Sequence, residues 1–450
     1  MKLSMVALRS TVIFMGVWPV LVGSFFGCRG EADKPAPAAS RVRPGIEVLL
    51  ENRLDLVRGR KAGLITNPTG VDARLGSGVE LLLQAEGVNL VALYGPEHGI
   101  RGNAQAGEYV PFYFEDKFKI RGRQIPVFSL YGQSLKPDAG MFNNIDDYMR
   151  SFDTTTTGKI PESAMIEDVE VLIYDIQDVG TRVYTYVATM AYAMQAAAES
   201  GIPFIVLDRP NPVNGVDMEG PVLEYPEFSS FIGLYPIPER HGMTVGELAL
   251  LINDRFLGKK ADLTIVPMTG WRREMWFDKT GLPWVIPSPN IPTPDTACVY
   301  PGQVCLEGTN ISEGRGTTKP FEFFGAPWID GFELVRKLNA LDLPGVIFRE
   351  ACFTPTFSKY SGQLCSGAQV HVVDRKTYRT FETALHIVKA VKDMHPDKFE
   401  FHADYFDKVM GTAKIRERLE AGRSIDEIVS GYEPGLKEFA ALRRPYLLYE

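Results

Sequence analysis

The chain lacks the short motifs that mark several large classes of enzyme. Its 450 residues contain no Gly-x-Gly-x-x-Gly run between a predicted strand and a predicted helix, and no Walker loop. We therefore expect no site for a dinucleotide or a nucleoside triphosphate. The Gly-x-Ser-x-Gly turn of serine hydrolases and the paired-histidine motif of zinc hydrolases are also missing. These absences predict an activity that uses neither a cofactor nor a metal ion.

Positive charge is in short supply as well. Lys and Arg total 48 against 56 Asp and Glu, which gives a formal net charge of -8. There is no basic stripe, so nucleic acid is a poor partner. With 45% hydrophobic and 23% charged residues, the composition is that of a globular protein, and the length favours two domains over one.

The start of the chain reads as a targeting segment. An apolar run from Thr11 to Gly27 follows a positively charged beginning, is short for a membrane span, and has the layout of a secretory signal. Cys28 ends this run and resembles a bacterial lipoprotein site. We expect residues 1–28 to be a signal peptide and residues 29–44 a linker, with the protein exported across the inner membrane. It then stays in the periplasm or is anchored by a lipid at Cys28; cleavage without a lipid and an uncleaved anchor are the alternatives.

The remaining cysteines are Cys298, Cys305, Cys352 and Cys365, and their spacing is not that of a zinc site. In an oxidising compartment they can form two disulfides. Buried free thiols are an equal alternative, because cysteine packs as a small hydrophobe.

Strand and helix patterns alternate between Ile46 and Leu257. Strands are predicted over 62–66, 88–94, 125–129, 169–175 and 202–207, and helices over 75–85 and 187–199 and from Thr244, which forms a capping box with Glu247. Such alternation predicts an α/β domain with a doubly wound parallel sheet, to which we assign residues 45–257.

The pattern changes after Gly258. The expected elements are a strand over 264–268, an irregular stretch rich in Pro and Gly over 270–326, helices over 329–341 and 378–394, a strand over 367–373 and short helices over 404–441. These predict a smaller α+β domain over residues 258–450. The long irregular stretch is expected to close over a cleft between the two domains, where the active site would lie.

Polar residues gather where the predicted strands end. Asn67, Glu97, Asp175 and Asp208 each follow a strand, and in a parallel sheet those ends share the edge at which ligands bind. Glu97 lies in the run 95–102 with His98 and Arg101. A glutamate there can donate a proton and an arginine can hold an anion; a solvated structural loop is the alternative.

Other polar runs carry further candidates. In 307–318, Glu307, Asn310, Glu313 and Arg315 can offer acceptors to sugar hydroxyls and a cation to an acid group, unless this is a flexible solvated loop.

Two more runs leave their alternatives open. Asp178 either partners Glu97 or pairs with Arg182, and Asn211 either shapes a turn or binds a polar ligand. His241 precedes the capped helix, whose N-terminus points at whatever lies there. A metal site made by Glu97, His98 and His241 from separate loops is a weaker alternative.

Six motifs together resemble the NamZ (YbbC-like) family of exo-β-N-acetylmuramidases. They are GLITNPTG at 63–70, GPEHGIRG at 95–102, YDIQDVGTRVYTY at 174–186, LDRPNPVNG at 207–215, ERHGMT at 239–244 and EGTNISEGRGTTKPFEFFGAPW at 307–328. The resemblance runs from about Gly45 to the C-terminus. It implies a Rossmann-like N-terminal domain, a smaller C-terminal domain, and removal of N-acetylmuramic acid from the non-reducing ends of peptidoglycan fragments, in cell-wall turnover or recycling.

The resemblance also implies roles for individual residues. Glu97 resembles the family's proposed catalytic glutamate and is expected to be the general acid. The second carboxylate is left open among Asp178, Glu313 and Glu307, and the substrate's own acetamido group is a further alternative.

The lactyl carboxylate of muramic acid calls for a cation. Our choices are Arg315 and Arg101, with Arg182 and Arg209 behind them. Hydroxyls and the acetamido group are expected to meet other polar side chains, namely Asn67, His98, Asn211, His241 and Asn310. Two other classes stay open: an envelope lipoprotein that binds muropeptides without cleaving them, and a metal-dependent hydrolase of cell-wall amides.

Overall fold

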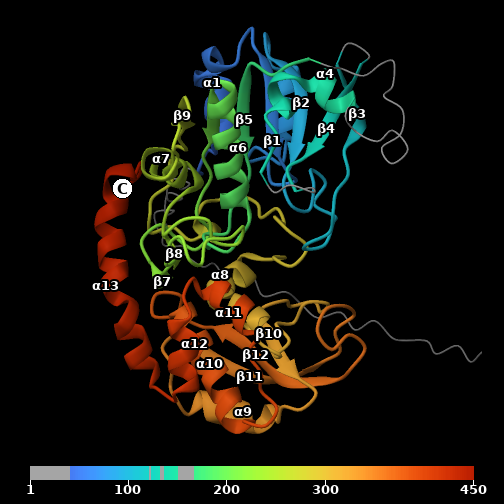
Figure 1. The fold of residues 1–450 in the computed structure, drawn as a ribbon. Coiled ribbons are helices and arrows are strands. Elements are labelled where there is room, and N and C mark those ends of the chain that lie inside the picture. The colour runs from blue at the N-terminus through green and yellow to red at the C-terminus, as the bar shows by residue number, and fades with distance from the viewer. Residues whose placement is uncertain (1–40, 121–122, 132–135, 151–166) are drawn as a thin grey trace, which may run out of the picture. The chain divides into compact units, whose positions relative to one another are not determined.

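A seven-stranded sheet with the order β3-β4-β2-β1-β5-β6-β9 forms the centre of the larger part of the protein (Figure 1). All neighbours in it are parallel except β3 and β4. Our computed structural model describes residues 41–120, 123–131, 136–150 and 167–450. The strands of this sheet are β1 (Lys61–Thr66), β2 (Asn89–Gly95), β3 (Tyr113–Ile120), β4 (Arg123–Ser129), β5 (Val171–Asp175), β6 (Phe204–Leu207) and β9 (Leu263–Val266).

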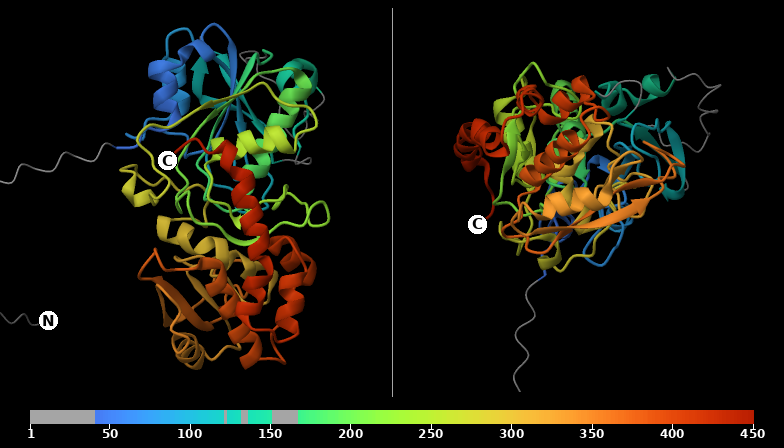
Figure 2. Two further views of the ribbon diagram at one scale, coloured as in Figure 1. Left: turned by 90° about the vertical axis from the view of Figure 1, so that its left-hand side faces the viewer. Right: turned by 90° about the horizontal axis from the view of Figure 1, so that it is seen from below.

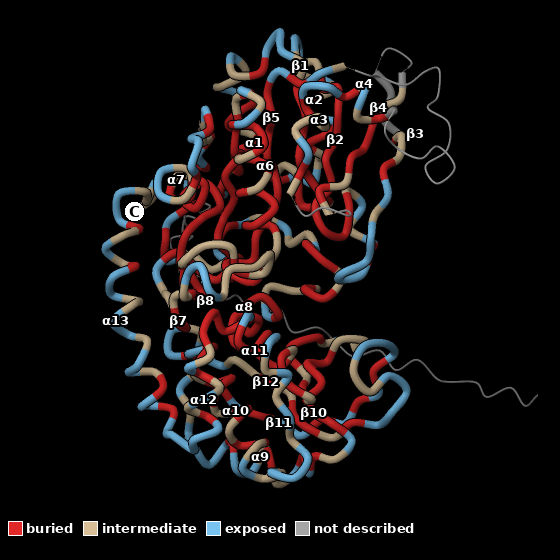
Figure 3. The backbone as a smooth tube through the Cα atoms, viewed as in Figure 1, coloured by how far each residue is buried: buried red, intermediate tan, exposed pale blue. Residues whose placement is uncertain are grey.

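Both faces of the sheet are covered, which explains why its strands read as near-continuous apolar runs. Alternate residues of β1 belong to different cores: Leu64 packs with α1 and α2, whereas Ile65 packs in the core that contains α6 and α7. Figure 3 shows the central strands as buried along their length. The helices of this part are α1 (Gly45–Asn52), α2 (Gly78–Gln84), α3 (Gly140–Asn143), α4 (Ile145–Arg150), α6 (Tyr186–Ser200) and α7 (Val245–Arg255), with the 3-10 turn η1 (Leu54–Leu56).

Local signals at the helix ends agree with the sequence. Gly201 ends α6 in the left-handed conformation, with φ of 70°, where glycine carries no steric penalty. The capping box predicted for Thr244 and Glu247 is present at the start of α7. Together with the parallel pairing of the strands, these helices confirm the α/β architecture predicted for this region.

A second, antiparallel sheet lies in the C-terminal part, with the order β10-β12-β11. Its strands are β10 (Phe323–Ala326), β11 (Val346–Phe353) and β12 (Cys365–Val372), and β7 (Glu219–Val222) and β8 (Pro238–Arg240) form a separate pair. The helices here are α8 (Pro294–Gln303), α9 (Gly331–Asn339), α10 (Thr380–Met394), α11 (Ala403–Met410), α12 (Lys414–Glu420) and α13 (Ile425–Arg443), with the 3-10 turns η2 (Phe277–Lys279), η3 (Val304–Gly308) and η4 (Arg444–Tyr446).

The structure differs from the predicted domain division in one respect. β9 lies beyond the predicted boundary at Leu257, yet it pairs in parallel with β6 in the large sheet. The described residues 41–450 cluster as one compact unit. A composition change along the chain does not reveal which sheet a later strand joins, because strand pairing is decided by tertiary contacts.

The stretch expected to be irregular, 270–326, contains the helix α8. Its sequence includes Pro301 and Gly302, which usually interrupt helices. Thr293 accepts a hydrogen bond from Thr296 N and Pro294 opens the helix, so its N-terminus is well formed. The helix is nearly all buried, and packing therefore outweighs propensity here.

The four cysteines of the described residues are free thiols. Cys298, Cys305 and Cys365 are buried and Cys352 is exposed. Of the two alternatives drawn from the sequence, the structure therefore has the free thiols. Cys28 and the rest of the predicted signal and linker up to residue 40 lie outside the described residues.

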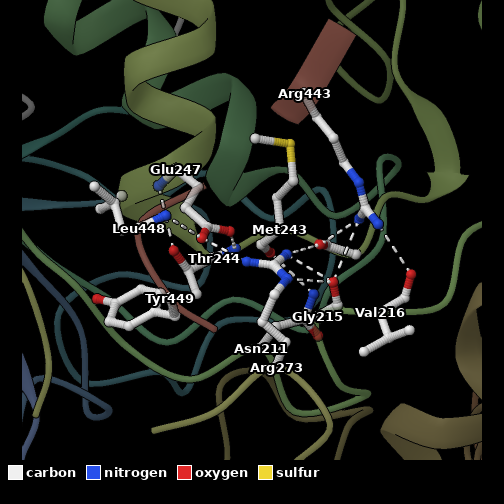
Figure 4. A network of polar contacts seen from close by, with 12 residues as sticks. Asn211, Gly215, Val216, Met243, Thr244, Glu247, Arg273, Arg443, Leu448 and Tyr449 are labelled. Atoms are coloured by element: carbon white, nitrogen blue, oxygen red, sulfur yellow. Dashed lines mark hydrogen bonds and ion pairs between the residues drawn. The ribbon is translucent and has the colours of Figure 1, made fainter. Parts of the chain in front are cut away.

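The C-terminal tail returns to the large sheet (Figure 2). Leu448 N donates to Glu247 Oε1 at 2.8 Å, and Tyr449 OH donates to Asp208 Oδ2 at 2.5 Å. Arg273 donates to Gly215 O at 2.6 Å and Arg443 donates to Val216 O at 3.0 Å (Figure 4). Both arginines also donate to Gly242 O at 2.6 Å. This network anchors the last residues at the N-terminus of α7.

In the parts of the chain that are described, we find no helix with the length and apolar character needed to cross a bilayer.

Candidate active site

A cavity of about 670 Å³ opens beyond the carboxyl ends of β2 and β5. The strand order changes direction around β1, and ligands of open α/β sheets bind at such a switch point. Residues from both halves of the chain line the cavity. The polar ones are Glu97, His98, Gln105, Tyr131, Tyr184, Thr185, Ser288, Asn290, Tyr300, Glu307, Glu313, Arg315, Ser358, Lys359 and Tyr405, and the apolar ones include Phe231, Ile291, Phe321 and Phe357.

The turn after β2 places Glu97 in this cavity. His98, the next residue, has a φ of 71°, a left-handed conformation that costs a residue other than glycine about 1–3 kcal/mol. A side chain at Gly95 would meet Ile100 N at 2.9 Å, so the turn closes tightly only with glycine there. The strained, tightly closed turn fixes the direction of the Glu97 side chain.

Only uncharged donors contact the Glu97 carboxylate among the described residues. Oε1 accepts from Gly107 N at 2.9 Å and Oε2 accepts from the Thr185 hydroxyl at 2.7 Å. Burial first, and then the neighbouring Glu97 carboxylate with which it is hydrogen-bonded, raises the pKa of Tyr131 to about 12. A hydroxyl can donate to a carboxylate or accept from a carboxylic acid, so this setting suits either protonation state.

His98 is held as a neutral ring. Its Nδ1 lies 2.7 Å from Ala104 O, a group that only accepts, so Nδ1 carries the proton and Nε2 is an acceptor. Burial lowers the pKa of His98 and outweighs the opposing effect of Glu97, while Arg315 lowers it further. At neutral pH the ring adds no charge to the cavity.

A cluster of opposite charges forms another wall of the cavity. Arg315 donates through Nε at 2.9 Å and Nη2 at 2.6 Å to Glu307 Oε1, and its Nε lies 3.5 Å from Glu313 Oε1. Glu313 Oε2 is 3.1 Å from Lys359 Nζ. Burial lowers the pKa of Arg315, but the two carboxylates outweigh burial and raise it above its ordinary value. Arg315 therefore stays charged at any working pH.

Several cavity residues were not found from the sequence. Lys359 precedes β12 in the connection from β11, and no strand was predicted at β11, so this loop had no place in the predicted architecture. Tyr131 and Tyr405 also line the cavity. Single aromatic or basic residues in loops carry no distinctive sequence signal, and only the fold brings these three together.

Asp178 is not among the residues that line the cavity. It lies in a buried layer, where its Oδ2 accepts from Gly180 N at 2.7 Å and is 3.9 Å from His241 Nε2. Met243 N donates to His241 Nδ1 at 3.2 Å, so the neutral ring carries its proton on Nε2. Burial, followed by the charges of three arginines, lowers the pKa of His241 to about 3. Asp178 and His241 face each other and do not contact the cavity.

Arg182 does not pair with Asp178; its partner is Glu239, at 2.7 Å, and both side chains are fully buried. Arg182 also donates to Pro221 O, Ile237 O and Val409 O at 2.7–3.0 Å. It therefore joins the β7–β8 region to α11, and it is not among the residues that line the cavity.

The structure also places the other predicted binding residues away from the cavity lining. Arg209 pairs with Asp175 at 2.6 Å, and the exposed Arg101 pairs with the buried Glu115 at 2.7 Å. Asn67 accepts from Thr69 N at 2.9 Å. Asn211 donates to Met243 O at 2.9 Å, and Asn310 donates to Lys398 O at 2.7 Å. Of the predicted site residues, the cavity thus brings together Glu97, His98, Glu307, Glu313 and Arg315.

The ionisation of Asp178 gives a testable pH dependence. Burial raises its pKa from 3.8 to about 7, against the opposing hydrogen bonds from backbone N–H groups. Between pH 3.8 and about pH 7, Asp178 is protonated in the folded protein and ionised in the unfolded chain. The free energy of unfolding therefore falls as pH rises through this range. Each pKa unit corresponds to about 1.4 kcal/mol.

We expect the Asp178→Asn variant to lose this part of the pH dependence, because an amide oxygen still accepts from Gly180 N but does not ionise. Thermal unfolding at pH 5 and pH 8 measures it: the wild-type Tm should fall more between the two than the variant's Tm. Parallel curves for the two proteins would show that Asp178 is not held protonated.

Fold and cavity together define a class: α/β proteins whose cavity combines carboxylates, hydroxyls and aromatic rings, as in enzymes that act on carbohydrates. Family models agree with this class. The model described as exo-β-N-acetylmuramidase NamZ, N-terminal, matches residues 62–154 and 148–295, and the corresponding C-terminal model matches residues 298–449. The chain belongs to the NamZ exo-β-N-acetylmuramidase family.

Individual relatives extend over nearly the whole chain. The peptidoglycan β-N-acetylmuramidase NamZ of Bacillus subtilis (strain 168) is 46% identical over 445 residues, which cover 98% of this chain and 100% of that protein. A crystal structure of a DUF1343 family protein from Bacteroides fragilis NCTC 9343 superposes with a TM-score of 0.78 at 38% identity, covering 92% of this chain and all of the other. A second protein of that family and organism gives a TM-score of 0.69 at 29% identity, covering 91% and 99%.

Proposed function

We propose that this chain is an exo-acting glycoside hydrolase. It removes N-acetylmuramic acid from the non-reducing ends of peptidoglycan fragments, in cell-wall turnover or recycling. One observation carries the proposal: in a member of the NamZ family, a single cavity holds Glu97 among uncharged donors and Glu313 between two cations. Glycoside hydrolysis needs two groups that differ in this way, a proton donor and a second group that stabilises positive charge.

Glu97 is the proton donor in this mechanism. No cation contacts its carboxylate in the described residues, so protonation does not break an ion pair. The Thr185 hydroxyl donates to Glu97 Oε2 and orients the carboxyl group, and Glu97 gives its proton to the glycosidic oxygen. The bond from the sugar to that oxygen then breaks, water adds to the sugar carbon, and the proton that the water loses returns to the Glu97 carboxylate.

Glu313 is the second carboxylate in this mechanism. Its two oxygens lie 3.5 Å from Arg315 Nε and 3.1 Å from Lys359 Nζ. A carboxylate held in this way stabilises the positive charge that develops on the sugar ring. Asp178 does not serve as the second carboxylate in this proposal, because it lies outside the cavity lining.

Arg315 supplies the cation for the lactyl carboxylate. Among the described residues its hydrogen bonds use only Nε and Nη2, which leaves Nη1 for a carboxylate in the cavity. The guanidinium carbon lies 5.0 Å from the ring centre of Phe321, within the range of a cation–π contact. An arginine in this setting binds a carboxylate with defined geometry.

A natural disaccharide tests the proposed reaction. We expect a disaccharide with N-acetylmuramic acid at its non-reducing end to be split into its two sugars, and the reverse disaccharide, with N-acetylglucosamine at that end, to stay intact. Mass spectrometry of the products distinguishes the two. Binding of the first disaccharide without cleavage would favour a non-catalytic muropeptide-binding protein.

We also propose that the protein acts outside the cytoplasm, either in the periplasm or anchored to a membrane through Cys28. The support is the sequence pattern of residues 1–28 alone. The Cys28→Ser variant should move from the membrane fraction to the soluble fraction when expressed from its full gene. Unchanged membrane retention would rule out a lipid on Cys28 as the cause.

A further inference from the structure

The connection between β11 and β12 contains an unusual stretch of backbone. Ser358 has a φ of 69° and Tyr360 a φ of 57°, so two left-handed residues other than glycine flank Lys359. Each such residue costs about 1–3 kcal/mol, and persists only where the surroundings hold it in place. Ser358 and Lys359 both line the cavity. The strain therefore lies at the active site.

The contacts of Lys359 show what holds this conformation. Its ammonium donates to Leu306 O at 2.8 Å, Glu307 O at 3.3 Å and Ile311 O at 3.0 Å, and to Glu313 Oε2 at 3.1 Å. The first two carbonyls belong to η3, and a helix end carries partial negative charge there. Three N–H groups are thus shared among four acceptors, so Lys359 has no donor left for a substrate anion.

Neighbouring residues hold the same loop from other sides. Tyr360 OH donates to Asn310 O at 2.7 Å and accepts from Trp328 Nε1 at 3.0 Å. Thr356 N donates to Gly316 O at 2.9 Å. The segment 356–360 therefore contacts the loop 306–316 along most of its length.

Charges connect this contact to the reacting groups. Lys359 binds one oxygen of Glu313, the other oxygen lies near Arg315, and Arg315 donates to Glu307. Tyr405 closes the cluster by donating to Glu307 Oε2 at 3.1 Å. Positive and negative groups alternate along this line, so the position of each depends on its neighbour.

We propose that Lys359 is a positioning residue of the active site. It fixes the loop 306–311 and the Glu313 carboxylate, and through Glu313 it sets the place of Arg315. This inference rests on the proposed function for its kinetic consequence, but the ordering of the loop is independent of any activity. The role is distinct from binding substrate, because all donors of Lys359 are used within the protein.

The Lys359→Met variant tests the proposal. Among the described residues, Glu313 then keeps Arg315 as its one ion-pair partner, with Glu307 beyond it and the Tyr405 hydroxyl in the same cluster. The Glu313 carboxylate is no longer held from the side of Lys359. We therefore expect kcat at neutral pH to fall about tenfold or more, while KM stays within a few-fold of the wild-type value.

Two further variants separate positioning from general damage. Lys359→Arg keeps the charge and should recover most of the lost kcat. Lys319→Met removes a matched ion pair, Lys319 Nζ to Glu322 Oε2 at 2.9 Å, outside the cavity lining, and should leave kcat and KM in place. An unchanged kcat in Lys359→Met, an equal loss in Lys319→Met, or no recovery in Lys359→Arg would overturn the proposal.

Backbone hydrogen exchange gives a readout that needs no activity. Amides of residues 306–316 should exchange faster in Lys359→Met than in the wild type and in Lys319→Met. Unchanged exchange there would overturn the positioning role even if the enzyme is active. The wild-type protein could also fail to hydrolyse any muramide while the Lys359→Met variant still exchanges faster. That result would contradict the proposed function and leave the ordering role standing.

Discussion

Replacing Glu97 with glutamine is expected to abolish turnover while substrate binding persists. The amide has no proton to give at neutral pH, and general acids contribute about 10²–10⁴-fold to such reactions. The oxygen of the introduced amide can still accept from Gly107 N, so the turn keeps its shape. We expect kcat for a disaccharide with terminal N-acetylmuramic acid, whose leaving group is a sugar hydroxyl, to fall at least about 10³-fold, with the Kd for N-acetylmuramic acid within a few-fold of the wild-type value.

A nearby glutamate supplies the control for this variant. Glu108 lies in the adjoining loop, accepts from Gln105 N at 2.8 Å and does not line the cavity. Glu108→Gln should keep wild-type kinetics. Full activity in Glu97→Gln, or an equal loss in both variants, would remove Glu97 from its assigned role as general acid.

Selectivity for the lactyl carboxylate is expected to depend on Arg315. Removing the arginine alone would leave two carboxylates without their partner, so we pair Arg315→Met with Glu307→Gln, which keeps the net charge of the cavity. A hydrogen bond to a charged group contributes about 1.5–3 kcal/mol. The double variant should therefore bind N-acetylmuramic acid about 10–100-fold more weakly.

The neutral sugar separates recognition from damage in that experiment. N-acetylglucosamine lacks the lactyl carboxylate, so its Kd should be the same for the double variant and the wild type. Calorimetric titration of both sugars measures the ratio. A parallel loss for both would mean that the pair shapes the cavity, and unchanged binding of both would mean that the carboxylate is held elsewhere.

The sequence predicted the large sheet and one side of the cavity well. Buried parallel strands read as apolar runs with polar residues at their carboxyl ends, and Glu97 and His98 lie where this pattern places them. The loop 307–318 also stands out in the sequence, because it concentrates charge among glycines. Both signals come from short stretches of sequence, and residues from both stretches line the cavity.

Partner choice among the arginines could not be predicted in the same way. Arg101 pairs with Glu115 on β3, a strand that was not predicted and that pairs in antiparallel fashion with β4. Arg209 is held by Asp175 across two adjacent strand ends, and Arg182 by Glu239. Each pairing joins residues that are distant in sequence, so a run of polar letters cannot reveal which cation is left for a ligand. Lys359 was missed for the same reason.

The most direct test of the account is hydrolysis of para-nitrophenyl N-acetylmuramide beside the matching N-acetylglucosaminide. The cavity predicts release of nitrophenol from the muramide by the wild-type protein, no comparable release from the glucosaminide, and no cleavage of the natural disaccharide by the Glu97→Gln variant. Release from the glucosaminide at an equal rate would contradict recognition of the lactyl group. Release from neither substrate, together with an uncut natural disaccharide, would contradict the enzymatic function itself.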